Sequence, residues 1–115
     1  MHKLIITFCA MALAGCHGSA ELNAVPSSLA DCGSNTRPSA VTVTWDATKA
    51  TKGGTVNLWV QNSDTFKPTL WIEDRPVGSA VTGNWALPDT RITLTDAANG
   101  DKLAEISIGA TTCKQ

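Results

Sequence analysis

The chain has 115 residues, of which 43% are hydrophobic and 17% are charged, and its formal net charge is −1. This length accommodates one domain and no more. Both signs of charge are dispersed and no basic stripe occurs, so nucleic acid is excluded as an expected partner.

Residues 1–15 are predicted to be a signal peptide that is removed on export. Lys3 supplies positive charge at the start, and residues 4–13 (LIITFCAMAL) form an uninterrupted apolar run. A helix needs about 20 residues to cross the hydrocarbon of a bilayer, so this run is too short to span it. It matches the hydrophobic region of a signal peptide instead.

Leu13, Ala14, Gly15 and Cys16 resemble the lipobox of bacterial lipoproteins, in which a branched residue and two small residues precede a cysteine. The resemblance implies that the Cys16 thiol accepts diacylglyceryl, that cleavage occurs before this residue, and that the new amino group is acylated. Two or more acyl chains anchor a protein stably. An ordinary secretory signal with a chance cysteine is the alternative.

The residue after the cysteine bears on which membrane holds the anchor. It is His17, whereas retention in the inner membrane of enteric-type bacteria usually requires Asp at this position. We therefore expect a lipid anchor in the outer membrane, with the domain facing the periplasm or the cell surface.

Cys32 and Cys113 are the cysteines left for the domain, because Cys9 leaves with the signal peptide and Cys16 carries lipid. Two thiols at opposite ends of a domain in an oxidising compartment are expected to form one disulfide. The closed loop of about 80 residues would be worth ~4–5 kcal/mol in the chain-entropy model. A metal site is the alternative, but it needs more ligands than are present.

After a short linker at residues 16–21, residues 22–115 are expected to form one all-β domain. No segment after residue 16 has convincing helical periodicity, and fourteen of the fifteen threonines lie there, a composition that fits strands. The predicted strands are residues 22–25, 41–45, 55–61, 69–73, 79–85, 91–95 and 103–108. Residues 26–39 are expected to be a loop, and the predicted turns are residues 53–54, 75–78, 88–89 and 99–100.

Alternation of apolar and polar residues assigns a face to most of these strands. The residues expected to point into the core are Val41, Val43, Trp45, Val56, Leu58, Val60, Ile92, Leu94, Ala104, Ile106 and Ile108. Trp59 falls on the opposite face of its strand, between Asn57 and Gln61. The pattern does not settle the register of residues 69–73 (TLWIE).

Six or seven short strands in about 90 residues predict a two-sheet β-sandwich of immunoglobulin type, and a small barrel is the alternative. From Val41 onward the chain resembles an immunoglobulin-like module of bacterial envelope proteins that is also attached to some sugar-transfer enzymes. The residues that carry the resemblance are 41–47 (VTVTWDA), 78–85 (GSAVTGNW), 94–96 (LTD) and 103–104 (LA).

This resemblance has two departures. The module has a glycine before the threonine where this chain has Pro88, Asp89 and Thr90, and the catalytic domain found beside some of these modules is not expected here. The resemblance implies a fold and an accessory or binding role, and it supplies no catalytic residue and no ligand.

We expect the protein not to be an enzyme and to bind no cofactor or metal. The two histidines, His2 and His17, precede the domain. A domain without histidine cannot hold a Ser-His-Asp or Cys-His site or a histidine-ligated metal. Glu73 and Asp74 are neighbours on a strand, so they point to opposite faces and are expected to be solvated acids.

Three further polar residues, Asp96, Asn99 and Asp101, surround the last predicted turn. Their spacing does not match the calcium loop of an EF-hand. Ordinary turn chemistry accounts for them.

Four tryptophans, at positions 45, 59, 71 and 85, are the candidates for recognition. Trp45 and Trp85 are expected to be core or half-buried residues. Trp59 lies on a polar sheet face, where an indole either contacts a partner protein or a sugar ring or covers a neighbouring loop or strand. Trp71 and the nearby Arg75 are candidate companions of Trp59.

The leading hypothesis is a non-catalytic binding or adaptor lipoprotein, which displays an immunoglobulin-like face to a protein or glycan of the envelope. The second hypothesis is a periplasmic inhibitor or immunity lipoprotein that blocks a toxin or a wall-degrading enzyme. Inhibitors plug clefts with protruding loops, and residues 62–68 would supply one with Phe66 at its tip. A passive structural component of the envelope is the third.

Overall fold

The computed structural model describes residues 20–62 and 66–113. The predicted signal peptide, Cys16, His17 and most of the linker lie outside this part. The strands are β1 (Glu21–Val25), β2 (Ser28–Asp31), β3 (Thr42–Asp46), β4 (Val56–Gln61), β5 (Thr69–Asp74), β6 (Val77–Val81), β7 (Arg91–Asp96), β8 (Lys102–Ser107) and β9 (Gly109–Thr112). One short helix, α2 (Thr48–Thr51), and a 3-10 turn, η2 (Gly33–Asn35), complete the described elements. No described helix is long and apolar enough to cross a membrane.

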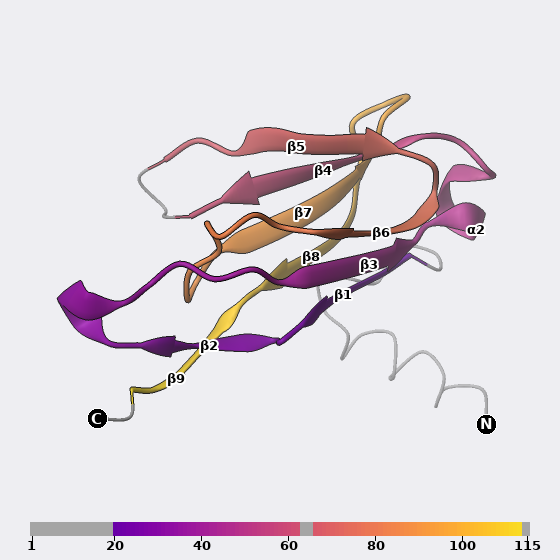
Figure 1. Cartoon of the computed structure of the whole chain (residues 1–115). Helices are drawn as coiled ribbons and strands as arrows, with labels where there is room; N and C mark the ends of the chain where they lie inside the picture. The colour runs from indigo at the N-terminus through magenta and orange to yellow at the C-terminus, as the bar shows by residue number, and fades with distance from the viewer. Residues whose placement is uncertain (1–19, 63–65, 114–115) are drawn as a thin grey trace, which may run out of the picture.

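The strands form three sheets, so the domain is mostly β (Figure 1). The two larger sheets have the orders β1-β3-β6 and β5-β4-β7-β8, and all their neighbours are antiparallel. The third sheet is the parallel pair β2-β9. Six of the predicted strands are confirmed to within one residue at each end, and they correspond to β1, β3, β4, β5, β7 and β8.

The prediction of a loop throughout residues 26–39 is wrong, because this segment contains β2. Leu29 of β2 is buried, and β2 pairs in parallel with β9, which lies more than 75 residues away along the chain. Gly109 permits this pairing, since a Cβ there would lie 2.8 Å from the Ser28 Oγ. The segment is therefore a strand because of a distant partner, which its composition does not reveal.

The boundaries predicted for β6 are also wrong. The strand begins at Val77, inside the predicted turn, and ends at Val81 instead of Trp85. Thr82 follows the strand and is 3% exposed, and its hydroxyl accepts a hydrogen bond from the Val41 backbone N–H at 2.8 Å. A side-chain oxygen thus takes the place of a ladder carbonyl, so regular pairing with β3 ends here.

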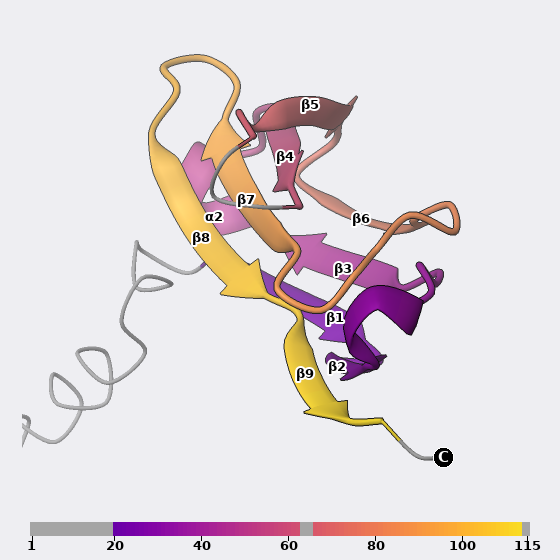
Figure 2. The same cartoon turned by 90° about the vertical axis from the view of Figure 1, so that its left-hand side faces the viewer.

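One apolar core contains residues of both larger sheets. Figure 2 shows how the strands of these two sheets are arranged. Every residue predicted to face the core is confirmed as buried in it or partly buried against it. The unsettled register of β5 is explained by a bulge: Leu58 pairs with Ile72 and Trp59 pairs with Leu70, so Trp71 is the extra residue. Trp71 and Ile72 both pack against the core, which strict alternation would forbid.

Trp45 joins β3 to β6 and to the turn before β6. Its indole is 3% exposed, and Nε1 donates a hydrogen bond to the Arg75 carbonyl at 3.0 Å. The ring lies across Gly78, because a Cβ at that position would be 2.5 Å from Trp45 Cζ2. Glycine in the middle of this strand is therefore a packing requirement.

The predicted disulfide between Cys32 and Cys113 is confirmed, with the two Cα atoms 5.0 Å apart and a sequence separation of 81. The cysteines directly follow β2 and β9. The bond therefore ties the ends of the parallel pair together.

Substitution of Gly78 tests the contact with Trp45. We expect Gly78→Ala to lower the free energy of unfolding by about 1–3 kcal/mol, because an added methyl group must displace a buried ring. Urea denaturation measures the change. Ser79→Ala, at an exposed position of the same strand, is the control and should change stability by less than about 0.5 kcal/mol. Equal stability of the two variants would contradict the packing argument.

Removal of the disulfide tests its contribution to stability. The double variant Cys32→Ser/Cys113→Ser is expected to lose about 4–5 kcal/mol of unfolding free energy, because the unfolded chain regains the freedom of a long loop. Guanidinium denaturation of the oxidised domain and of the variant gives the difference. A loss below about 1 kcal/mol would show that the bond is dispensable for stability.

Candidate functional site

The four-stranded sheet has a second face, which points away from the core. Residues paired across strands share a face, so the register places its side chains in rows. The rows are Gln61, Arg91 and Ser107; Leu70, Trp59, Thr93 and Glu105; and Glu73, Asn57, Thr95 and Lys102. These eleven residues are named the Trp59 face below.

Trp59 lies within this face and is half-buried. Its indole Nε1 donates a hydrogen bond to the Thr95 Oγ1 at 2.9 Å, so the ring leans over β7. With Lys67, Pro68 and Thr93 these two residues line an open hollow of about 430 Å³. The ring therefore covers part of a neighbouring strand, as one alternative expected, while its role in partner contact remains a prediction.

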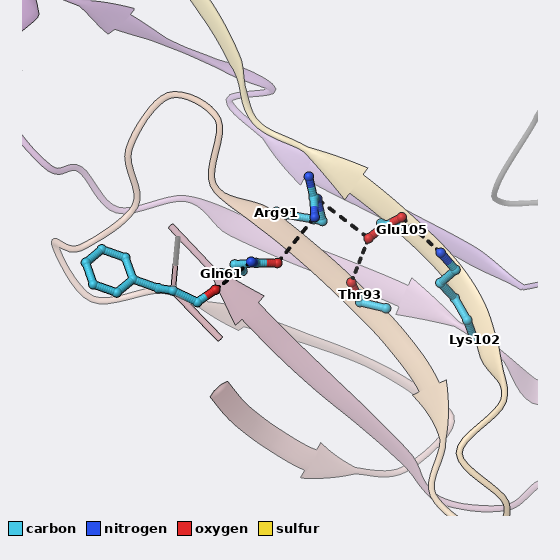
Figure 3. Close-up of polar contacts among 6 residues, drawn as sticks. Gln61, Arg91, Thr93, Lys102 and Glu105 are labelled. Atoms are coloured by element: carbon cyan, nitrogen blue, oxygen red, sulfur yellow. Dashed lines mark hydrogen bonds and ion pairs between the residues drawn. The ribbon is translucent and has the colours of Figure 1, made fainter. Parts of the chain in front are cut away.

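A chain of polar contacts crosses β8, β7 and β4 beside the hollow (Figure 3). Glu105 accepts hydrogen bonds from the Thr93 hydroxyl at 3.1 Å and from Lys102 Nζ at 3.2 Å. Its other close cation is Arg91, whose Nε lies 3.7 Å from the Glu105 Oε2. Because these groups are partly exposed, the ion pairs add at most about 1 kcal/mol to stability. Their effect is to hold long polar side chains in one arrangement.

The same chain of contacts continues into the segment before β5. Arg91 donates a hydrogen bond to the Gln61 Oε1 at 3.3 Å, and the Gln61 Nε2 donates one to the Phe66 carbonyl at 2.6 Å. Phe66 itself is 65% exposed. A second hollow of about 430 Å³ lies here, lined by Gln61, Phe66 and Lys67 among others. Lys67 lines both hollows, so they adjoin.

Asn57, two residues before Trp59, has a buried side-chain oxygen for which the described residues provide no hydrogen-bond partner. An unpaired buried acceptor costs about 1–3 kcal/mol. The Trp59 face thus contains a polar group whose position is not explained by the stability of the domain.

The structure separates the residues that the sequence grouped with Trp59. Trp71 packs edge-to-face on Trp85, with ring centroids 5.5 Å apart, and contacts the core. Arg75 is exposed after β5, and its carbonyl is the group bound by Trp45. Phe66, which the sequence placed at the tip of the candidate inhibitor loop, adjoins the Trp59 hollow through Lys67.

Sequence reasoning missed Arg91, Thr93, Thr95 and Glu105. The alternation that places Ile92 and Leu94 in the core also places the first three of these on the opposite face, so that signal was available. Their proximity to Trp59 was not, because it depends on the pairing of β4 with β7 and of β7 with β8.

The other polar residues that the sequence singled out lie in a turn or are exposed. Asp96 and Asn99 accept hydrogen bonds from backbone N–H groups of the β7–β8 turn at 2.9 Å, which is the turn chemistry expected. Glu73 and Asp74 are exposed, as predicted. Among the described residues, no group of three or more His, Cys, Asp or Glu is placed to hold a metal ion.

Asp46 lies at the end of β3, just before α2. Hydrogen bonds from the backbone and side chain of Thr48 lower the pKa of its carboxyl group, and Lys49 adds to the effect. This carboxylate accepts a hydrogen bond from the Thr48 N–H at the start of α2, and Asp46 belongs to the three-stranded sheet. It is therefore not part of the Trp59 face.

Comparison with known proteins identifies no relative of this chain. No family model, curated protein or solved structure matches the chain. What is established is a small β-rich domain closed by a disulfide, and the assignment of a role rests on the geometry of its surface.

Proposed function

We propose that this protein is a lipoprotein of the cell envelope, anchored through Cys16, whose domain binds a protein or glycan partner without catalysis. The residues 13–16 and the apolar run before them support the anchor. The Trp59 face supports the binding role, and it is the surface offered to the partner.

The observation that carries the binding role is the half-buried Trp59 beside an open hollow. Aromatic side chains that are rigid and partly exposed are favoured anchors in interfaces, because they bury a large area and lose little conformational entropy. Here the indole is held by Thr95, and the adjacent polar side chains are held by one another. Such a surface is organised before the partner arrives, which reduces the cost of binding.

We propose in addition that the two larger sheets form an immunoglobulin-like sandwich. Their shared core supports this arrangement. A second support comes from Asp89, which has a φ of 73° at the position where the related module has glycine. Asp tolerates the left-handed region better than most residues, so the departure from the module's pattern preserves the turn.

The binding role predicts that a partner can be trapped through this face. A photo-crosslinking amino acid at position 93, paired with Trp59 in its row, is expected to give adducts in producing cells. Trp59→Ala should reduce these adducts by at least about tenfold, because truncating an aromatic anchor costs about 2 kcal/mol or more. Gel electrophoresis and mass spectrometry of the adducts measure the loss and distinguish protein from glycan.

Two controls make this experiment decisive. Position 44 lies on the outer side of the other sheet, so a crosslinker there should not give the same adducts. Thermal denaturation checks that Trp59→Ala remains folded. Adducts that survive Trp59→Ala would contradict the proposal. Adducts lost with Phe66→Ala alone would favour the inhibitor hypothesis, in which the exposed Phe66 plugs a cleft.

The anchor is tested on the native protein. Mass spectrometry is expected to find a mature N-terminus at Cys16 carrying acyl chains, and the protein should fractionate with membranes. Cys16→Ser should release it from the membrane fraction, because the lipid chains supply the attachment. An unmodified N-terminus at another residue, with the protein free in solution, would overturn the anchor.

A further inference from the structure

The edge strands of the two larger sheets differ in how they are protected against pairing with another chain. Natural sheets block their edges with charges, bulges, proline or a covering segment. β5 and β8 each contain a bulge and at least two charged residues. β1 begins with Glu21, is followed by Pro26 and lies near β8. β6 (VGSAV) has no charge, no proline and no bulge in its pairing with β3, and Pro76 before it turns its carbonyl toward β3, to the Ala47 N–H.

The hydrogen bonds between β6 and β3 determine which backbone groups of β6 are left free. The Thr82 N–H bonds the Val41 carbonyl at 2.9 Å, and the Ala47 N–H bonds the Pro76 carbonyl at 2.7 Å. In an antiparallel ladder every second residue bonds the same neighbour. Therefore Val77, Ser79 and Val81 direct their N–H and C=O groups away from β3, and no described strand pairs with that edge.

The side chains of these three residues are exposed as well. Val77 is 53% and Val81 is 61% exposed, and both lie on the outer face of the three-stranded sheet. Val25, paired through Thr42 with Val81, is 69% exposed on the same face. Both cartoon views place β6 at the margin of this sheet, with β3 between it and β1 (Figures 1 and 2).

We propose that this edge pairs with the β6 strand of a second copy of the chain, antiparallel and about a two-fold axis at Ser79. The strand reads almost the same in both directions. Pairing centred on Ser79 sets Val77 against Val81 of the other copy, and Gly78 against Ala80. Valine pairs favour such a contact and no like charges oppose it. The residues that face each other would be those with free backbone groups, so each would exchange both hydrogen bonds.

The symmetry of the sequence favours a second copy over a foreign strand. A two-fold contact uses the same patch on both molecules, so a self-complementary strand satisfies it without a second surface. The result would be one continuous sheet in the order β1-β3-β6-β6-β3-β1. Because five residues bury a small area, the dimer is expected to be weak in solution and to dissociate in the micromolar range.

A cysteine at the axis gives a direct test in the full-length protein. Residues that exchange both bonds in an antiparallel pair have Cα atoms about 5.5 Å apart, within the range a disulfide spans. Ser79→Cys is therefore expected to form a disulfide-linked dimer in producing cells, seen on a non-reducing gel. Thr44→Cys, one strand further in on the same face, is the control and should remain monomeric.

Charge substitution at the same position tests the register by a separate route. Ser79→Lys and Ser79→Glu should each weaken self-association at least tenfold, because like charges meet at the axis. An equal mixture of the two variants should restore it. Analytical ultracentrifugation of the purified chains in detergent measures the dissociation constants.

Four outcomes overturn the proposal. They are a monomeric Ser79→Cys variant together with an unaffected Ser79→Lys variant, equal dimer formation by Thr44→Cys, failure of the charged mixture to associate, or a Ser79→Cys adduct with a different protein. The last would assign the edge to a foreign strand. None of these outcomes bears on partner binding by the Trp59 face, which lies on the other sheet.

Discussion

The row Leu58, Leu94 and Ala104 is the part of the structure on which the rest depends. These side chains lie side by side on β4, β7 and β8, and each is at most 3% exposed. Because neighbouring residues of a strand point to opposite faces, burying this row turns Trp59, Thr93 and Glu105 outward. A slip of one residue in either pairing would exchange the two rows. The hydrophobic core and the candidate binding face are therefore two consequences of one register.

Other stabilising contacts of the fold lie outside the four-stranded sheet. The disulfide and the β2–β9 pair join residues 28–32 to residues 109–113, and Trp45 on Gly78 packs β6 against β3. None of these contacts involves a residue of the Trp59 face. Substituting polar side chains of the Trp59 face therefore leaves these contacts in place.

Much of the fold follows from local patterns. Alternation along residues 41–45 and 91–95 gave both the strands and the residues that enter the core, because a half-buried strand leaves its period in the sequence. β2 was missed because its partner β9 is remote, and the end of β6 was missed because a hydroxyl of Thr82 replaces a ladder carbonyl. These are contacts between distant residues, which a local pattern does not contain.

The candidate site was predictable to the same extent. The position of Trp59 on a polar face follows from alternation alone. The prediction that Trp71 accompanies Trp59 is wrong, because a bulge turns Trp71 toward Trp85 and the core. The neighbours that Trp59 does have, Thr93 and Thr95, are set by strand order. The sequence pattern therefore indicated Trp59, whereas the pairing of the strands determines which residues surround it.

The two surfaces proposed for recognition lie on different sheets, and this separation has a physical consequence. Pairing at the β6 edge uses backbone groups of the three-stranded sheet, whereas the Trp59 face belongs to the four-stranded sheet. A dimer joined at β6 would therefore carry two Trp59 faces. For a partner with repeated sites, such as a polymer or an ordered assembly, two linked faces bind more tightly than either alone. A weak edge contact would then control avidity without touching the residues that recognise the partner.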